Sequence, residues 1–371
     1  MEMRTSPWQL FRFGFVYFNS QSTVFLVPAL LASSTYNAWM GVLGGYLLSL
    51  ILLGAMIYIG SRYPELPWLQ FGKSLMGKWL HGVFVILLLA WCVYYTSYDI
   101  QSFVLFFGSN YLRNTPPWFL QAVIAPIIMY TAMRGAKNII YMADGLFVLI
   151  LASTTLILLL FTQQANFHML SALPHHLLPS SELFENSLTT LSWFAEWMIF
   201  LFIVPDLKLD KNAARSLFAV ASVLSLLVIT GWLLALMNFG PQLARQFQYP
   251  YLEIIRSMEP DSILSKVAPL VIGIWTTSMF IHSSFLIYAA SRCATYFTKA
   301  KGHRFFIVLM TVFAVCIAFY YSNHLSLYQK HYYSMEVVII WIVVECIPVY
   351  YAAVYLVGLL RRGKSLRLSR R

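Results

Sequence analysis

The chain contains the stretch Phe25-Leu26-Val27-Pro28-Ala29-Leu30. A near copy, Phe202-Ile203-Val204-Pro205-Asp206-Leu207, follows 177 residues later, and both copies lie inside long apolar segments. A proline removes a backbone donor and clashes with the preceding turn, so Pro28 and Pro205 are expected to interrupt two membrane helices. Paired interrupted segments in the two halves of a membrane chain are typical of a transporter-type binding site.

The composition indicates a membrane protein. Of the 371 residues, 60% are apolar and only 11% are charged, and the mean hydropathy is +0.69. The apolar residues fall in runs of roughly 20, the length that crosses about 30 Å of hydrocarbon. These runs are continuous rather than alternating, which favours helices over a β-barrel. We therefore predict an all-α polytopic membrane protein.

Ten membrane spans are predicted from these runs: 8–32, 38–60, 79–107, 117–133, 140–162, 183–205, 213–237, 262–290, 303–320 and 335–360. With the N-terminus inside, 20 of the 25 Lys and Arg residues fall on the cytoplasmic side. The five left outside are Arg113, Arg245, Arg256, Lys266 and Lys330. This asymmetry supports an even number of spans and places both termini in the cytoplasm.

Ten spans divide into five and five. We predict one membrane domain over residues 1–371, with a first repeat at 8–162, a second at 183–360 and a basic cytoplasmic tail at 361–371. The two proline stretches then fall in spans one and six at matching depth. That is the arrangement of an inverted-repeat transporter whose first helix in each half is discontinuous. The six basic residues of the tail favour anionic lipid as a partner.

Two extramembrane stretches have a character of their own. The loop 167–181 carries His168, His175 and His176 without Lys or Arg. A solvated external loop is favoured there over a metal site, because no third convergent ligand accompanies the paired histidines. In the stretch 239–261, Tyr251, Ile254, Ile255 and Met258 form an i, i+3, i+4, i+7 stripe. The stripe predicts a short helix on the membrane surface or over the bundle.

Span one is polar just before its proline, with Asn19, Ser20, Gln21, Ser22 and Thr23 in succession. One interpretation is an unwound stretch whose amides and hydroxyls contact a polar ligand. The other is hydrogen bonding between helices, which small polar residues also provide. We favour the ligand interpretation, with helix breaks at Pro28 and Pro205.

Span six carries Glu196 beside Trp193, about ten residues into an apolar segment. A carboxylate at that depth is expensive and normally faces a cavity, a cation or a proton path. A protonated carboxyl bonded to a neighbouring helix is the alternative. We interpret Glu196 as a ligand-binding and proton-relay residue, and Trp193 as a ligand-binding residue.

Polar groups in three other spans complete the candidate site. In span three, Tyr95, Tyr98 and Asp99 share one helical face by their spacing, and in span eight Ser278 and His282 lie one turn apart. Each of these has a structural alternative as an interhelical hydrogen-bonding group. The predicted ligand-binding residues here are Tyr95, Tyr98, Thr277 and Ser278, and the predicted proton or ion relay residues are Asp99, His282 and, in span ten, Glu345.

Enzyme motifs are missing from the sequence. It has no Walker A loop, no dinucleotide-binding glycine pattern, no HExxH and no GxSxG. The four cysteines are scattered, without the spacing of a metal site or a disulfide framework. We therefore expect no catalytic residues, cofactor or metal. The basic tail comes without a nucleic-acid-binding signature, so no nucleic acid is expected as a partner.

The order of several motifs resembles the spore germination permease family, the B subunits of nutrient germinant receptors within the amino acid–polyamine–organocation transporter superfamily. The matching stretches are Trp8-Gln9-Leu10 leading to Leu26-Val27-Pro28, Asn37-Ala38-Trp39, Arg62-Tyr63-Pro64-Glu65 followed by Gly77-Lys78, Phe194-Ala195-Glu196 with Val204-Pro205, and Tyr249-Pro250-Tyr251-Leu252-Glu253 preceding Gly273-Ile274-Trp275. The resemblance covers nearly the whole chain. Ser20 and Ser22 stand where family members usually have glycines, and Asn37 where they often have Asp.

The resemblance implies a nutrient-sensing subunit in the inner membrane of the spore, with a larger membrane A subunit and a lipoprotein C subunit as partners. It places a small solute, such as an amino acid, between spans one, three, six and eight. It also assigns residues 20–23 to the unwound part of span one and Glu196 to the acidic position of span six. Two other functions stay open: a proton-coupled amino acid transporter, and a structural or ion-permeation component of a membrane complex.

Overall fold

The computed structural model describes residues 6–33, 36–175, 180–204, 207, 209–257, 268–298, 302–332 and 334–368, and within them the regular structure is entirely helical. In chain order the elements are α1 (Pro7–Ser20), the π-helix η1 (Gln21–Leu26), α2 (Val27–Ser33), α3 (Ala38–Arg62), α4 (Trp68–Met76), α5 (Lys78–Asn110), α6 (Pro117–Met133), α7 (Ala136–Phe161), the 3₁₀-helix η2 (Phe167–His175), α8 (Ser180–Phe194), the 3₁₀-helix η3 (Glu196–Phe202), α9 (Lys211–Ala244), α10 (Pro250–Ser257), α11 (Ala268–Thr298), α12 (His303–Asn323), α13 (Leu325–Tyr332), α14 (Met335–Glu345) and α15 (Ile347–Leu368).

The predicted multi-pass helical architecture is confirmed. Among the described residues, six helical segments are long and apolar enough to cross a membrane: Pro7–Ser33, α3, α5, α7, α9 and α12. The pair α14 and α15, bent by 40°, adds a seventh if it forms one span. The other three predicted spans coincide with the shorter α6, with α8 and η3 together, and with α11.

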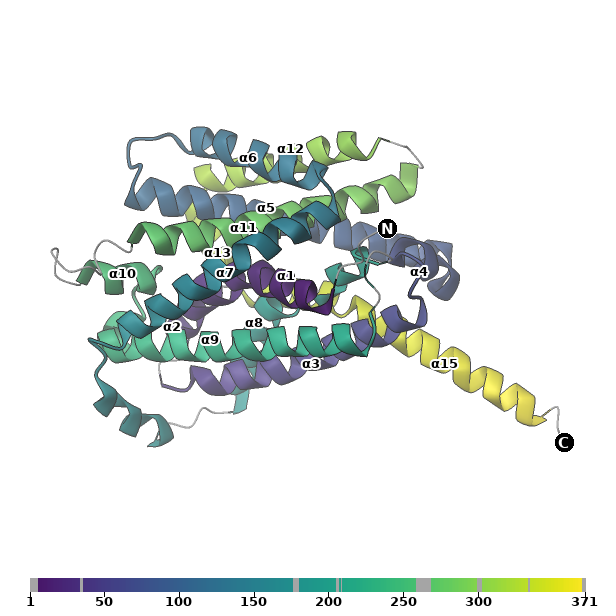
Figure 1. Cartoon of the computed structure of the whole chain (residues 1–371), viewed down its shortest axis with the longest axis horizontal. Helices are drawn as coiled ribbons and strands as arrows, with labels where there is room; N and C mark the ends of the chain where they lie inside the picture. The colour runs from purple at the N-terminus through teal and green to yellow at the C-terminus, as the bar shows by residue number, and fades with distance from the viewer. Residues whose placement is uncertain are drawn as a thin grey trace.

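The helices form an elongated bundle with span one in its interior (Figure 1). Helices α6 and α12 lie along one edge, α5 and α11 come next, and α3 and α9 lie along the opposite edge. In span one, 89% of the most apolar window is buried, against 17% for α7. Span one is therefore enclosed by protein on nearly all sides, whereas α7 lies at the periphery.

The interruption of span one has a different form from the predicted unwound stretch. The chain stays helical from Pro7 to Ser33, and the interruption is the π-helical segment Gln21–Leu26 just before Pro28. A π-helical turn absorbs an extra residue and so accommodates a proline that lacks its amide donor. A helical backbone needs no glycine, which agrees with serine at positions 20 and 22.

Span six is interrupted before its proline. Helix α8 ends at Phe194, Ala195 leaves helical geometry (φ −122°, ψ 23°), and the 3₁₀-helix η3 starts at Glu196. The break thus falls at the buried glutamate, about ten residues before the expected position. Pro205 itself lies outside the described residues.

Helix α3 holds the first half of span six at close range. A Cβ at Gly45 would lie 2.5 Å from Cβ of Thr190, and one at Gly41 would lie 2.6 Å from Cβ of Asn186. Small residues let membrane helices approach this closely. One turn beyond Gly45, the Ser49 hydroxyl donates to the Phe194 carbonyl (3.1 Å), which is the last residue of α8. Helix α3 therefore satisfies a backbone group that the break in span six leaves free.

Two further elements, α10 and α15, lie at the ends of the bundle. The predicted amphipathic segment is α10, which buries Leu252, Ile254 and Ile255 against the bundle, while Met258 lies outside the described residues. Before it, α9 is kinked at Gly240, whose φ of +70° is readily adopted by glycine. At the other end, α15 projects away from the bundle (Figure 1) and its backbone carries the predicted tail as helix to Leu368.

Candidate functional site

A buried histidine joins two carboxylates at the centre of the bundle. His282 Nδ1 lies 2.7 Å from Asp99 Oδ2, and His282 Nε2 lies 2.9 Å from Glu196 Oε2. The three side chains come from α11, α5 and η3, and each is at most 1% exposed. The structure therefore brings together three predicted relay residues from spans three, six and eight.

Four further side chains complete this cluster, which we call the central network. The Tyr17 hydroxyl donates to Glu196 Oε2 (2.6 Å), and Gln21 Nε2 and the Ser283 hydroxyl donate to Asp99 (2.9 and 2.6 Å). The Tyr95 hydroxyl donates to Gln21 Oε1 (3.2 Å). Because Tyr17 and Gln21 are one helical turn apart, span one contacts both carboxylates.

The arrangement of donors and acceptors defines what the central network can hold. A doubly protonated imidazole donates from both nitrogens, which matches a carboxylate at each side of His282. Removing one proton from the imidazole would leave one of the two carboxylates without its bond from His282, although Tyr17, Gln21 and Ser283 would still donate to the pair. The helices that carry these groups would then adjust to restore the lost bond. The network is thus a site at which protonation and helix packing are linked.

Ser278 of α11 contacts the backbone of span one directly before the interruption. Its hydroxyl accepts a hydrogen bond from the Ser20 amide (2.8 Å) and donates to the Val16 carbonyl (2.6 Å). Val16 and Ser20 are the i−4 and i partners of an ordinary α-helix, so this side chain of α11 is inserted into the backbone ladder. The next residue, Gln21, begins the π-helix.

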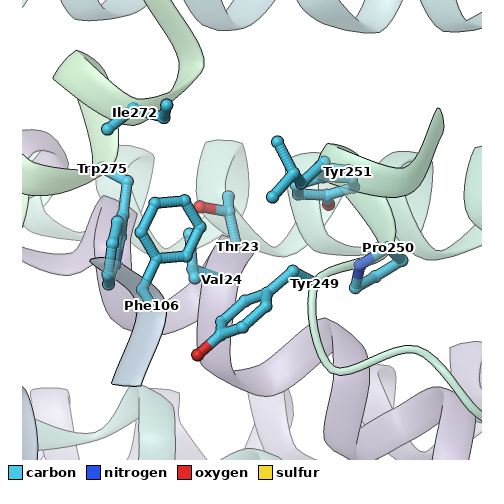
Figure 2. Close-up of a pocket in the computed structure, with 9 residues that line it drawn as sticks. Thr23, Val24, Phe106, Tyr249, Pro250, Tyr251, Ile272 and Trp275 are labelled. Carbon is cyan, nitrogen blue, oxygen red and sulfur yellow. The ribbon is translucent and has the colours of Figure 1, made fainter. Parts of the chain in front are cut away.

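A small pocket lies beside the interrupted part of span one. Figure 2 shows Thr23 and Val24 of span one, Phe106 of α5 and Trp275 of α11, with Tyr249 to Tyr251 leading into α10. A second pocket shares Thr23, Val24, Tyr251 and Trp275 with the first and extends to Asn19 and to Thr154, Ile157 and Leu158 of α7. Apart from the Asn19 amide, a few hydroxyls and the Trp275 indole, both linings are apolar.

Both pockets are small in this conformation. Their volumes are about 30 and 50 Å³. A single water needs roughly 10–15 Å³ by this measure, so they hold a few waters and not an amino acid. Asn19 is 2% exposed and Trp275 3%, and neither Asn19 Oδ1 nor Trp275 Nε1 has a hydrogen-bond partner among the described residues. These two groups offer an acceptor and a donor at the wall of an apolar cavity.

Helix α10 covers the pockets. Tyr251 lines both of them, and its hydroxyl fits against Gly231 of α9, where a Cβ would lie only 1.8 Å from that oxygen. Burial raises the pKa of Tyr251, so the phenol stays neutral at ordinary pH. At the far end of α10, Arg256 donates to Asn110 Oδ1 at the end of α5 (2.8 Å). Opening the site therefore requires α10 to separate from its neighbours.

The predicted ligand-binding residues divide into three groups. Asn19 and Thr23 line pockets, whereas the side chains of Gln21, Tyr95 and Glu196 belong to the central network. The others lie elsewhere. The Ser22 hydroxyl donates to the Phe18 carbonyl, Ser20 and Ser278 meet through the ladder insertion, and Thr277 is half-buried and lines neither pocket. Trp193 packs on Phe25 and Trp341, and Tyr98 packs among Tyr94, Tyr328 and Trp341.

Glu345 stands apart from the other predicted relay residues. It ends α14 at the bend before α15 and is 2% exposed. Neither carboxyl oxygen has a hydrogen-bond partner among the described residues. An unpaired carboxyl at such a site is far cheaper to bury protonated than ionised. Glu345 therefore makes no hydrogen bond to the central network among the described residues, and its relay role stays a prediction.

Sequence reasoning missed several residues of the site. Tyr17 could have been found from its spacing, because it precedes Gln21 by one helical turn and so lies on the same face. Tyrosines are common in this chain, however, and the spacing alone does not single this one out. Ser283 follows His282 directly. Phe106 and Trp275 are separated by 169 positions, and only the folded structure brings their rings to 4.5 Å. Such aromatic contacts leave no local pattern in an apolar sequence.

Comparisons with known proteins agree with this architecture. The family model described as "Spore germination protein" matches residues 6–325. Spore germination protein YndE of Bacillus subtilis (strain 168) is 20% identical over 268 residues, which is 71% of this chain and 73% of that protein.

Solved structures of transporters share the fold. A Na+-coupled sialic acid symporter, substrate-bound and outward-open, superposes with a TM-score of 0.67 at 12% identity, over 86% of this chain and 75% of that one. Mhp1, a nucleobase-cation-symport-1 family transporter closed around bromovinylhydantoin, gives 0.67 at 10% identity, over 85% and 72%. The helical arrangement is therefore a membrane transporter fold, and with the family match along residues 6–325 the chain belongs to the spore germination protein family.

Proposed function

We propose that this protein is the membrane subunit of a spore nutrient receptor, which binds a small solute and transmits its presence to partner subunits. The observation that supports this most directly is the small pocket against the interrupted part of span one. It combines an apolar wall with two unpaired polar groups, Asn19 Oδ1 and Trp275 Nε1. An amino acid is the solute class that we expect, and we expect it to bind between spans one, three, six and eight.

The mechanism that we propose is a shift between closed and open arrangements of the helices. Solute entering from the side of α10 would separate α10 and α11 from span one and disturb the ladder insertion at Ser278. Because Tyr17 and Gln21 belong to the same span, that movement would reach Glu196 and Asp99. A ligand shifts such an equilibrium only through its different affinity for the two arrangements.

The setting of this receptor is part of the same proposal. We place the protein in the inner membrane of the spore with both termini in the cytoplasm, consistent with the 20 of 25 basic residues on that side. A larger membrane A subunit and a lipoprotein C subunit are the proposed partners, and the basic tail 361–371 would contact anionic lipid. No catalytic step is part of the function.

The experiment is a germination dose–response on spores that carry this chain with its partner subunits, using a panel of amino acids. Glu196→Gln removes the charge opposite His282 while keeping the shape of the side chain. We expect the concentration for half-maximal germination to rise about tenfold, the equivalent of about 1.4 kcal/mol. Glu185→Gln, on the exposed face of α8 nine residues before that helix ends, is the control and should leave the response unchanged.

Two outcomes would contradict the proposal at different levels. An unchanged dose–response in Glu196→Gln, with equal protein in the membrane, would remove this residue from the site. Failure of every amino acid to trigger wild-type germination and to bind the purified protein in calorimetry would reject the amino-acid receptor itself.

A second candidate is a proton-coupled amino acid transporter. The specific observation in its favour is His282 between two carboxylates, because one proton there changes the charge of a site that connects three spans. Proteoliposomes with an imposed pH gradient distinguish the two functions. Accumulation of labelled amino acid that stops when the gradient is collapsed would favour transport. Binding without accumulation would favour the receptor.

A further inference from the structure

A large groove shares no lining residue with the two solute pockets. It has a volume of about 520 Å³ and is lined by α5, α12 and α14, including Ala90, Trp91, Tyr94, Phe313, Ile340 and Trp341. We call it the lateral groove. None of the predicted site residues lines it.

The mouth of the lateral groove opens toward hydrocarbon. Phe313 is 52% exposed and Ile340 is 60% exposed, and both lie on apolar helices assigned to membrane spans. The deeper wall consists of Trp91 and Trp341, which are 4% and 1% exposed. The groove is therefore a recess in the lipid-facing surface rather than an aqueous cavity.

The chemistry of the lining decides what can fill this recess. Water needs two to four polar partners to be retained in a cavity. Here the polar groups are the Tyr94 hydroxyl, which is already bonded to the Tyr321 hydroxyl (2.7 Å), and two indole N–H groups. Water is thus a poor occupant, whereas hydrocarbon would supply the dispersion contacts that an empty apolar recess lacks.

The volume decides between the two kinds of hydrocarbon-like occupant. A helix about 10 Å across that rises 1.5 Å per residue takes roughly 120 Å³ per residue. The whole empty space of the groove, about 1030 Å³ with its open mouth included, would hold roughly nine residues of a partner helix, less than half of a membrane span. A flexible acyl chain has no such minimum width. We propose that the lateral groove binds the acyl chain of a membrane lipid between α5, α12 and α14.

This lipid site adjoins the central network through aromatic contacts. Trp341 stacks on Tyr95 with ring centroids 4.3 Å apart, and the Tyr95 hydroxyl donates to Gln21. Gln21 in turn donates to Asp99. A bound acyl chain supports the outer face of Trp341 and so forms part of the wall behind the network. The proposal goes beyond nutrient binding and does not depend on it.

Photolabelling tests the site directly. The full-length protein is reconstituted in phosphatidylcholine vesicles containing a lipid with a diazirine in its acyl chain, and labelled peptides are quantified. We expect labelling of residues 87–94, 310–317 and 340–344 above that of the peripheral helix α7. Ala90→Phe fills the groove and should lower this labelling at least fivefold. Ala152→Phe, an exposed alanine on α7, is the matched control and should not.

Thermal unfolding gives an independent measurement. In detergent, added phosphatidylcholine should raise the Tm of the wild type and of Ala152→Phe, because a ligand that binds the folded state stabilises it. The gain should be much smaller in Ala90→Phe, whose ring occupies the recess. If Ala90→Phe fails to fold, Ile317→Ala, which enlarges the groove, should raise the labelling instead. Even labelling of all lipid-facing helices, an unchanged pattern in these variants, or a partner protein cross-linked there in the intact receptor would overturn the proposal.

Discussion

At the scale of single residues, Ser278 is the clearest case of a side chain with a defined physical role. Its hydroxyl replaces one backbone hydrogen bond of span one with two bonds through α11. Ser284, six residues later on the same helix, is also fully buried, but its hydroxyl has no partner among the described residues. The two serines therefore form a matched pair with opposite expectations.

Ser278→Ala should destabilise the protein by about 1–3 kcal/mol, because it leaves a buried amide and a buried carbonyl without their partner. Ser284→Ala should change stability by less than about 0.5 kcal/mol, because it removes a hydroxyl that makes no bond. Unfolding of the purified protein in detergent, followed by circular dichroism, measures both. Equal effects of the two substitutions would show that the ladder insertion carries no energy.

At the scale of elements, the contact between α3 and α8 positions the break in span six. Gly45 faces Thr190 at a distance that allows no Cβ, whereas a Cβ at Gly54, farther along the same helix, would meet nothing within 4 Å. Beyond this contact, the Trp197 indole and the Phe194 carbonyl both bond to Ser49. Displacing α8 would therefore move the start of η3, where Glu196 lies.

Gly45→Ala should lower the stability by about 1–3 kcal/mol, the usual range for overpacking. Gly54→Ala should leave it unchanged or raise it by up to about 1 kcal/mol, since alanine is the better helix former. Thermal unfolding of both variants in the same detergent makes the comparison. A Gly45→Ala protein as stable as Gly54→Ala would mean that α3 and α8 separate easily and do not fix the break.

At the scale of the whole molecule, the proposed function requires a second arrangement in which the two small pockets are larger. Helix α10 is linked to the end of α5 by the bond from Arg256 to Asn110, and Arg256 also pairs with Glu253 (2.8 Å). Arg256 is exposed and Asn110 and Glu253 are half-buried at the surface, so the link is weak. It can bias an equilibrium between open and closed forms without locking it.

Asn110→Asp should strengthen the link by adding an opposite charge to Arg256, and so raise the nutrient concentration for half-maximal germination. Arg256→Gln should lower it. An exposed ion pair contributes about 0.2–1 kcal/mol, which corresponds to shifts of roughly 1.5- to 5-fold. Asn323→Asp, at the end of α12, is the control, because Asn323 also bonds the carbonyl four residues earlier. Shifts of both variants in the same direction would contradict a closing role for α10.

Prediction from sequence succeeded for features that depend on a short stretch of chain or on the summed hydrophobicity of a segment. Span positions follow from apolar length, and the buried positions of Asp99, Glu196 and His282 follow from charged or polar residues deep in apolar runs. Prediction failed on the form of the interruptions. Pro28 identified the right region of span one, but whether a helix unwinds there or forms a π-turn depends on Ser278, 250 positions away.

The sequence by itself determined that this is a polytopic helical membrane protein of the germination family, because hydrophobic length, charge asymmetry and motif order are properties of the chain alone. Tertiary structure decided which polar residues meet. It places His282 between both carboxylates, α10 against the two small pockets, and the lateral groove between α5, α12 and α14. These outcomes depend on how helices that are distant in the sequence pack. A buried hydrogen bond contributes energy only when donor and acceptor have both been brought together, and a groove has a defined volume only when all the helices around it are in place.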